Sequence, residues 1–371
     1  MCSVPLNLLE LFNDVPDPRL DRRKLHSLHE ILTLAVLAML AGAENFTDME
    51  DFGNAKAAWL RTFLALEHGI PSHDTFNRVF QALKPEAFLD CFLRWTQSLR
   101  REVAQEIVAL DGKALRRALN RGQSLPYIVS AWASSNRLVL GQLKVADKSN
   151  EITALPPLLR QLELAGCLVT VDALGCQKKI AKEIKESDAD YVMALKGNHE
   201  TVHAEVKRFL DDAIARQEVQ VVSLETVEKD HGRLEIRRWY LSDDLDWFAD
   251  KGQWEGLRTM GLVETVRQVG DQPPTTERRY FLGSIAKDIE AFARATREHW
   301  GVENPVHWVL DVLFGEDLSR ARTGHAPENL ATLRRLALNL LRRDPGTQRS
   351  LRRQRKAAGW NDSYLRQLLG I

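Results

Sequence analysis

The sequence lacks a long apolar run, a secretion signal and paired cysteines. Its longest apolar stretch, residues 31–41, is well short of the roughly 20 residues that a membrane-spanning helix needs. The amino-terminal residues include acids and a proline where a secretion signal would have a basic end and an apolar stretch. The scattered cysteines, which form no CxxC pair of the zinc-binding kind, are Cys2, Cys91, Cys167 and Cys176. We expect a folded, cytoplasmic protein with reduced thiols and no membrane contact.

The sequence also lacks an excess of charge of one sign. Its 51 Lys and Arg residues balance 51 Asp and Glu residues, so the net charge gives no indication of a nucleic-acid partner. The local distribution differs, because residues 322–356 contain ten basic side chains against Glu328 and Asp344. Such a run is usually a solvated tail, but it also suits neutralisation of DNA phosphates. The first candidates for DNA contact in this run are Arg342 and Arg343.

The first part of the chain has helical patterns. Within residues 1–100, Ser27 and Glu30 have the spacing of a capping box, and Pro71-Ser72 is typical of a helix start. Short helices of this kind could form a helix-turn-helix DNA reader or a dimerisation unit, although a purely structural bundle is more common. We predict an all-helical N-terminal domain.

The pattern changes to strands and helices over residues 101–341. Three strand patterns, EIVALDG, PYIVSAWAS and RLVLGQLKV, are followed by alternating helix and strand patterns. The order β-β-β-α-β-α-β is that of the ribonuclease-H-like fold, which belongs to the α/β class. Four more strand patterns at about residues 218–287 indicate a β-rich insertion. We therefore predict a ribonuclease-H-like catalytic core with a β-rich insertion, followed by a basic C-terminal segment over residues 342–371.

Two aspartates follow apolar strand patterns. Asp111 ends the first pattern and Asp172 ends the fourth, and these strands are neighbours in the predicted order. An acid after a buried run is costly without a partner, although Asp111 also suits a turn and Asp172 could cap a helix. Glu303 lies near the start of a later helix that could pack beside them. Three carboxylates from different elements suit Mg²⁺, and two such ions about 4 Å apart promote phosphodiester chemistry.

Three other acids compete for the third position. They follow Glu303 in the same helical stretch and would replace it if the helix had another phase; they are Asp311, Glu316 and Asp317.

Several stretches beyond these acids resemble one family. They cover most of the chain: DPR (17–19), HSLHEIL (26–32), PSHDTFNRVF (71–80), VALDGKALR (108–116), DKSNEITALPPLL (147–159), VTVDALGCQKKIA (169–181), YVMALKGNHE (191–200), KDHGRLEIR (229–237) and REHWGVENPVHWVLDVLFGED (297–317). These stretches are similar to bacterial insertion-sequence transposases of the DDE class, in the H-repeat-associated group. The resemblance implies metal binding by Asp111, Asp172 and Glu303, with Mg²⁺ as the ion and Mn²⁺ as a substitute. It also implies double-stranded DNA as partner, a homodimer on paired DNA ends, and a nucleoid-associated location in the cytoplasm.

The sequence departs from a signature that related transposases often have around the third acid. That signature reads Tyr-x-x-Arg-x-x-x-Glu-x-x-x-x-x-x-Lys. Here its tyrosine, arginine and lysine positions hold Thr296, His299 and Leu310. We expect this chain to hold phosphates beside its active site with other residues.

The residues around Glu303 suggest some of those contacts. His299 and His307 lie four residues before and after Glu303, so on a continuous helix all three share a face. This spacing lacks the compact order of zinc hydrolases, and we expect either phosphate contact and support of the acids or a purely structural role for the histidines. Trp300 and Trp308 occur at core spacing, so we expect them to be buried, with stacking on a flipped base as the alternative.

Further DNA contacts are predicted at a strand end and in the insertion. Lys196 follows a strand pattern, beside a glycine that DNA backbone could approach closely. The insertion contains a basic cluster that could be a solvated hairpin, although the resemblance favours a DNA-gripping loop; its members are Lys229, His231, Arg233 and Arg237.

Taken together, the residues and the resemblance predict a transposase that cleaves and rejoins DNA at the ends of an insertion sequence. Two alternatives stay open at this point. The same carboxylates would serve a ribonuclease-H-like nuclease without strand transfer, and the basic segment would serve an inactive DNA-binding remnant.

Overall fold

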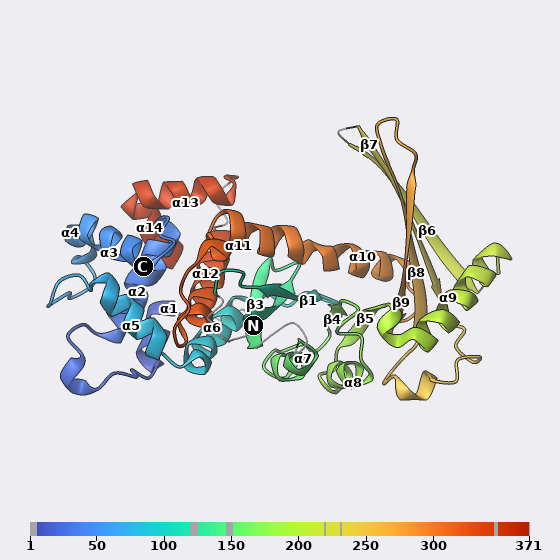
Figure 1. Cartoon of the computed structure of the whole chain (residues 1–371), viewed down its shortest axis with the longest axis horizontal. Helices are drawn as coiled ribbons and strands as arrows, with labels where there is room; N and C mark the ends of the chain where they lie inside the picture. The colour runs from blue at the N-terminus through green and yellow to red at the C-terminus, as the bar shows by residue number, and fades with distance from the viewer. Residues whose placement is uncertain are drawn as a thin grey trace.

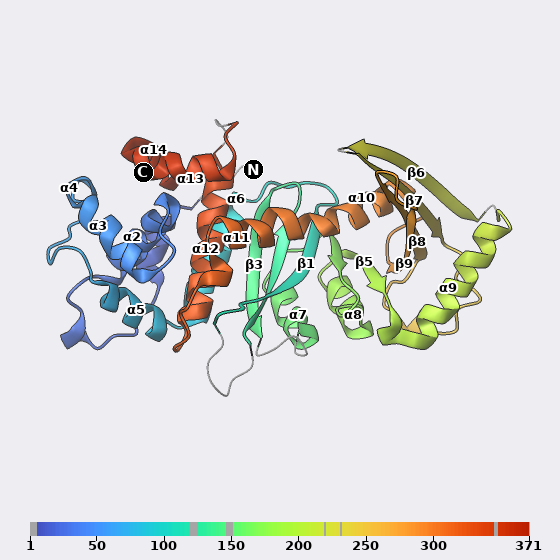
Figure 2. The ribbon, with the colours of Figure 1, turned by 45° about the horizontal axis from the view of Figure 1, so that its top comes forward.

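One nine-stranded sheet runs through the molecule, and a helical unit closes one end (Figures 1 and 2). These features come from a computed structural model, which describes residues 6–118, 125–145, 151–218, 220–230, 232–344 and 348–370. Within this part of the chain no single helix is long and apolar enough to cross a membrane. Helices α2 and α3 together meet that criterion of length and composition, but they bend by 92° between them.

Five strands form the centre of the sheet in the order β3-β2-β1-β4-β5. Their bounds are Ile107–Ala114 (β1), Tyr127–Ala133 (β2), Leu138–Val145 (β3), Leu168–Val171 (β4) and Asp190–Leu195 (β5). Strand β1 runs antiparallel to β2 and parallel to β4, and β4 runs parallel to β5. The predicted neighbourhood of the first and fourth strands is therefore confirmed.

Helices cover both faces of these strands. Helices α7 (Glu151–Arg160) and α8 (Lys178–Glu186) lie on one face, and α10 (Ile289–His299) crosses the other (Figure 1). Val108 of β1 packs in the apolar cluster with α7 and α8, whereas Ile107 packs in the cluster with α10. Burial on both sides explains why the strand sequences are continuous apolar runs rather than alternating ones.

The β-rich stretch extends the same sheet instead of forming a separate one. Its strands are Val221–Asp230 (β6), Arg233–Ser242 (β7), Thr259–Val269 (β8) and Thr275–Gly283 (β9), preceded by helix α9 (Glu200–Ala215). Strand β9 pairs antiparallel with β5, and β8, β7 and β6 follow in order. The outer ends of β6 and β7 project beyond the layer of α10 (Figure 1).

The helical unit is built from both ends of the chain. Its amino-terminal helices are Leu8–Leu11 (α1), Leu28–Ala41 (α2), Phe46–Ala55 (α3), Ala57–Leu60 (α4), His73–Ala82 (α5) and Pro85–Leu99 (α6). Its carboxyl-terminal helices are Ala326–Arg342 (α12), Leu351–Trp360 (α13) and Asp362–Leu369 (α14), and all three pack against α2. The sequence indicated no elements for the basic segment, but it folds into two helices whose apolar residues join this core.

Helix α2 is the buried centre of this unit. Ser27 caps it by accepting a hydrogen bond from the Glu30 N–H at 3.1 Å, as the capping-box spacing predicts. In a complete capping box the Glu30 carboxylate would accept the backbone N–H of Ser27. Here it accepts the backbone N–H of Leu66 instead, at 2.7 Å. The same residue pair therefore starts the helix and ties a distant loop to it.

Helix α12 joins the helical unit to the sheet through Asn339. The buried Asn339 side chain accepts from the Val139 N–H and donates to the Val139 carbonyl, both at 2.9 Å. The amide thus pairs with β3 at the edge of the sheet as a neighbouring strand would.

We expect Asn339→Ala to lower the free energy of unfolding by about 2 to 5 kcal/mol. The substitution leaves the N–H and C=O of Val139 without partners, and each unsatisfied buried group costs about 1 to 3 kcal/mol. Urea unfolding of both proteins measures the difference. Asn54→Ala, at an exposed position of α3, is the control and is expected to change the stability by less than about 0.5 kcal/mol. Equal urea midpoints for wild type and Asn339→Ala would contradict this account.

Candidate active site

Asp111 and Asp172 lie side by side on neighbouring strands. Asp111 does not end its strand as the sequence predicts, because β1 continues to Ala114 along β2, whereas Asp172 directly follows the end of β4. The last residues paired between the parallel strands β1 and β4 are Leu110 and Val171, and the two aspartates follow directly. The residues before them are almost fully buried, while both aspartates are half-buried. The chain thus brings two carboxylates from residues far apart in sequence to one edge of the sheet.

The helical stretch that carries Glu303 crosses over this edge. Helix α10 continues as a 3₁₀ turn (Trp300–Val302), a π-helical segment (Glu303–Trp308) and helix α11 (Val309–Val312). Pro305 has no N–H for the carbonyl four residues earlier, and a π turn accommodates this loss by widening the helix. The 3₁₀ turn contains Gly301, and the π turn contains Pro305.

Two histidines hold this stretch against both strands. His299 Nδ1 lies 3.0 Å from the Thr170 hydroxyl on β4, and His307 Nδ1 lies 3.4 Å from a carboxylate oxygen of Asp111 on β1. Glu303 lies between the two contacts, four residues from each histidine, and its side chain is exposed. The helix therefore contacts β4 and β1 through residues on either side of Glu303 in the sequence.

Both histidines are neutral at pH 7. Burial lowers the pKa of His299 to about 4, although the nearby carboxylate of Asp172 acts in the opposite direction. Burial also lowers the pKa of His307 to about 4, and Arg335 adds to this effect. The histidines consequently contribute hydrogen bonding near the acids without neutralising their charge.

The loop after Asp172 is held by its own hydrogen bonds. Asp172 Oδ1 accepts the N–H groups of Leu174 at 3.0 Å and Gly175 at 3.2 Å. It therefore caps a turn and not the start of a helix, because α8 begins only at Lys178. Asn198 donates to the Ala173 carbonyl at 2.7 Å. Gly175 must be glycine, because a Cβ there would lie 2.5 Å from Val171. The sequence predicted a DNA contact at Lys196, but it did not indicate that the nearby Asn198 supports this loop by a hydrogen bond.

The three acids that compete with Glu303 lie around one buried lysine. Lys113 Nζ is 2.7 Å from Asp311, 2.7 Å from Asp317 and 3.5 Å from Glu316. Burial opposes its charge, but these acids outweigh burial and raise the pKa of Lys113. The buried Glu316 also accepts from Arg335 at 2.8 Å. Among the described side chains no cation lies within ion-pair distance of Glu303, so it differs from its three competitors.

The acids do not form a closed metal cage. Within the described residues, no group of three or more His, Cys, Asp or Glu side chains is arranged to hold a metal ion. The arrangement consists of two neighbouring aspartates and an exposed glutamate on the helix that crosses them.

The prediction that Trp300 and Trp308 are core residues is wrong. Their exposed fractions are 48% and 56%, because the 3₁₀ and π turns rotate the helix away from the regular spacing on which the prediction depended. Trp300 packs instead beneath the guanidinium of Arg279, at 4.4 Å from the ring centre. The end of α10 therefore presents an aromatic surface beside Glu303.

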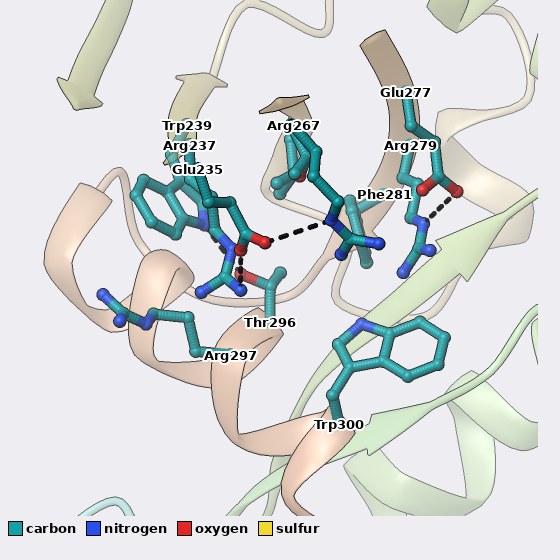
Figure 3. Close-up of a pocket in the computed structure, with 12 residues that line it drawn as sticks. Glu235, Arg237, Trp239, Arg267, Glu277, Arg279, Phe281, Thr296, Arg297 and Trp300 are labelled. Atoms are coloured by element: carbon teal, nitrogen blue, oxygen red, sulfur yellow. Dashed lines mark hydrogen bonds and ion pairs between the residues drawn. The ribbon is translucent and has the colours of Figure 1, made fainter. Parts of the chain in front are cut away.

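An arginine-rich pocket of about 260 Å³ lies next to Trp300 (Figure 3). Its floor and walls come from β7, β8, β9 and the end of α10, with the cations Arg237, Arg267, Arg279 and Arg297. Arg267 is 3.3 Å from Glu235, and Arg279 is 2.7 Å from Glu277. Two lining acids against four lining cations leave the pocket with a positive excess.

Of these four arginines, Arg237 is among the DNA contacts predicted from the sequence. Arg267 and Arg279 follow from strand periodicity, because alternate residues of neighbouring strands share a face, whereas Arg297 comes from helix α10. In register, Arg267 pairs with Glu235 and Arg279 pairs with Val263, so one face of β7–β9 collects them. Grouping every second residue of the predicted strands would have placed these strand arginines on one face.

The remaining predicted DNA contacts are dispersed. Lys196 is exposed and follows β5 at the same edge of the sheet as the aspartates, and it helps to lower the pKa of Glu277. Lys229 and Arg233 lie at the exposed turn of the β6–β7 hairpin, and His231 lies outside the described residues.

Arg342 and Arg343 lie next to each other but differ in environment. Arg342 turns inward: its guanidinium lies 4.4 Å from the Trp132 ring centre and donates to the Pro305 carbonyl. Burial lowers its pKa to about 9. Arg342 therefore supports the π-helical segment from inside the protein, whereas Arg343 stays exposed.

We expect Glu316→Gln to lower the free energy of unfolding at pH 7 by about 3 to 5 kcal/mol, because Arg335 and Lys113 lose a buried partner. Burial opposes its charge, but Arg335 and Lys113 dominate and lower the pKa of Glu316 from 4.5 to about 2. Since this folded-state pKa is depressed, the contribution is complete above about pH 4.5 and is lost as the pH falls towards 2.

Urea unfolding between pH 7 and pH 3 measures both effects. The variant should lose part of the acid dependence that the wild type shows below pH 4.5. Glu102→Gln, an exposed substitution, should leave stability and pH dependence unchanged. An identical acid dependence in wild type and Glu316→Gln would exclude this role for Glu316.

Comparison with known proteins places the whole chain in one family. A family model described as "Transposase DDE domain" matches residues 104–340, and one described as "DDE_Tnp_1-associated" matches residues 9–96. "Putative transposase YncI" of Escherichia coli O157:H7 is 37% identical over 369 residues, which cover 98% of this chain and 94% of the relative. "H repeat-associated putative transposase YhhI" of Escherichia coli K12 is 35% identical over 371 residues, covering 98% and 97%. The chain therefore belongs to the DDE transposases, in their H-repeat-associated group.

Proposed function

We propose that this protein cleaves DNA at the ends of an insertion sequence and joins those ends to target DNA, with Asp111, Asp172 and Glu303 as its catalytic acids. The observation that carries the proposal is the adjoining position of the two aspartates on parallel strands beneath the helix of Glu303. The central order β3-β2-β1-β4-β5 also supports a ribonuclease-H-like catalytic core.

The donor chemistry fits hard divalent cations. DDE transposase domains generally use divalent metal ions, and the three proposed residues supply the carboxylate oxygens that Mg²⁺ or Mn²⁺ prefers. When bound, such ions stabilise the charge on the attacking and leaving oxygens of a phosphodiester. Glu303 would complete the set from the crossing helix, and we assign it this part because its two flanking histidines contact Thr170 on β4 and Asp111 on β1.

The chain's own residues then position the reactants. His299 and His307 are neutral at pH 7, so they add no positive charge beside Asp111 and Asp172. The hydrogen bonds of Leu174 and Gly175 hold Asp172 Oδ1 at the strand end. In cleavage the nucleophile is water, and in joining it is the freed 3′-hydroxyl of the DNA, so no protein nucleophile is required.

Double-stranded DNA is the proposed partner, and the arginine-rich pocket belongs to its binding surface. Lys196, Lys229 and Arg233 add exposed cations at the same edge and along the hairpin. Reaction at two paired ends would require two copies of the chain, so we infer a homodimer on DNA. The associated cellular site is the nucleoid in the cytoplasm.

We expect Asp172→Asn to lower metal-dependent cleavage of DNA that carries the terminal repeats by more than about a hundredfold. Loss of an outer partner of a metal ligand already costs 10- to 100-fold, and loss of a ligand oxygen should cost more. Gel assays with Mg²⁺ follow cleavage, and a separate assay with pre-cleaved ends follows strand transfer. Asp246→Asn is the matched control, because that side chain is 96% exposed and remote from the three acids in sequence.

These assays also separate the alternatives. Cleavage without joining would identify a nuclease, and DNA binding with neither reaction in the wild type would identify an inactive remnant. If the folded Asp172→Asn variant cleaves DNA as fast as the wild type, the proposed mechanism is wrong.

We expect Arg279→Gln to weaken binding to end DNA and to reduce the slope of log K against log salt by about 1. The guanidinium is proposed to contact one phosphate, and each such contact contributes about 0.9 to that slope. Fluorescence anisotropy over a series of salt concentrations measures both quantities. Arg216→Gln is the control, since that side chain is 72% exposed at the end of α9. An unchanged salt slope for Arg279→Gln would remove the pocket from the DNA-binding surface.

A further inference from the structure

Helix α13 is held against the protein in one orientation. Arg355 points inward, where its Nε donates to the Met39 carbonyl at 3.1 Å and its Nη2 donates to the Ala43 carbonyl at 2.8 Å. Gly359 lies against α2, since a Cβ there would be 2.8 Å from the Ala41 carbonyl oxygen. These contacts decide which side of α13 faces solvent.

The outward side of α13 is basic. Arg352, Arg353 and Lys356 are exposed, and within the part of the chain that the structure describes none of them has a carboxylate at ion-pair distance. The sequence contains no Asp or Glu from residue 345 to residue 361, so the helix provides no internal compensation. This differs from the arginine-rich pocket, where Glu235 and Glu277 pair with the cations.

An exposed indole adjoins these cations. Trp360, the last residue of α13, is 79% exposed, which is more than any other large hydrophobic side chain that the structure describes. Trp360 lies four residues after Lys356, so it adds a large exposed ring beside the cations of the same helix face.

Helix α13 and the arginine-rich pocket flank the stretch that carries Glu303. In both views α10 and α11 run between α13 at one end and strands β6–β9 at the other (Figures 1 and 2). Helix α13 and the outer ends of β6 and β7 rise on the same side of the molecule (Figure 1). A long polyanion that lies across the helix of Glu303 can therefore extend towards both basic surfaces.

We propose that the outer face of α13 is a second DNA-binding surface, which holds duplex DNA beyond the segment in the active site. Arg352, Arg353 and Lys356 neutralise phosphates, and Trp360 packs on the adjoining sugar. The assignment rests on the proposed function, because the duplex is the one whose end the three acids cleave. Charge complementarity and the unpaired state of the three cations select DNA over an apolar partner.

The test uses the full chain with the double substitution Arg352→Gln and Lys356→Gln, which lie four residues apart on one face. Binding is measured by anisotropy over a salt series with a long labelled duplex that contains the terminal repeat. The slope of log K against log salt should fall by about 2, because two phosphate contacts are lost at about 0.9 each. A short duplex that carries only the terminal base pairs should bind wild type and variant equally.

Two matched variants control for charge and folding. Lys179→Gln with Lys182→Gln removes two exposed cations from α8, on the opposite face of the sheet, and should leave the slope unchanged. Arg352→Lys with Lys356→Arg keeps both charges and should bind as the wild type does. Circular dichroism and thermal unfolding verify that all variants fold.

Several outcomes would overturn the proposal: an unchanged slope for the α13 variant, an equal decrease for the α8 variant, or an equal preference for an RNA duplex in competition. Asp111→Asn separates this proposal from the proposed function, since it should abolish cleavage and leave long-duplex binding intact. If the wild type fails to cleave under any condition, the proposed function fails, while the binding comparison still decides the role of α13.

Discussion

The ion cluster around Lys113 is the interaction on which the geometry of the site depends. Lys113 lies two residues after Asp111 on the same strand, so its side chain points to the same face of the sheet. Its bonds to Asp311 and Asp317 hold the end of the Glu303 stretch on that face. Because a buried charge without a partner is costly, the helix cannot slide along the sheet without exposing or orphaning these groups. The placement of the helical stretch that carries Glu303 is thus set by charges that have no direct part in the proposed chemistry.

The arginines of the carboxyl-terminal region divide into two functions that the sequence does not distinguish. Three of them point inward and have buried partners. Arg335 donates to the Glu316 carboxylate, Arg342 lies against the Trp132 ring, and Arg355 donates to carbonyls at the end of α2. Arg352 and Arg353 carry the same charge outward. A run of basic residues therefore contains structural anchors as well as surface cations, and only packing assigns each residue to one group.

Much of the fold and part of the site could be predicted from the sequence. Apolar runs located the central strands, and their order placed Asp111 beside Asp172, as the parallel register confirms. Regular helical spacing failed at Trp300 and Trp308, because Gly301 and Pro305 change the helix type and no periodic pattern encodes the resulting rotation. The partners of the buried acids also could not be predicted, since Lys113 and Glu316 are distant in sequence and each resembles a surface residue when taken alone.

The continuous sheet connects the β-rich stretch rigidly to the strands that carry the two aspartates. Strand β9 pairs with β5, and β5 pairs with β4, which ends at Asp172. Helix α10 packs on β7 and then crosses β4 and β1, so one rigid helix connects the arginine-rich pocket to the strand ends. The pocket is therefore positioned relative to the carboxylates through hydrogen-bonded strands and a buried helix rather than through a loop, and so would be the DNA that we propose it binds. This rigid connection favours a reaction in which the scissile phosphate must be placed accurately, because small displacements from the reactive geometry cost large factors in rate.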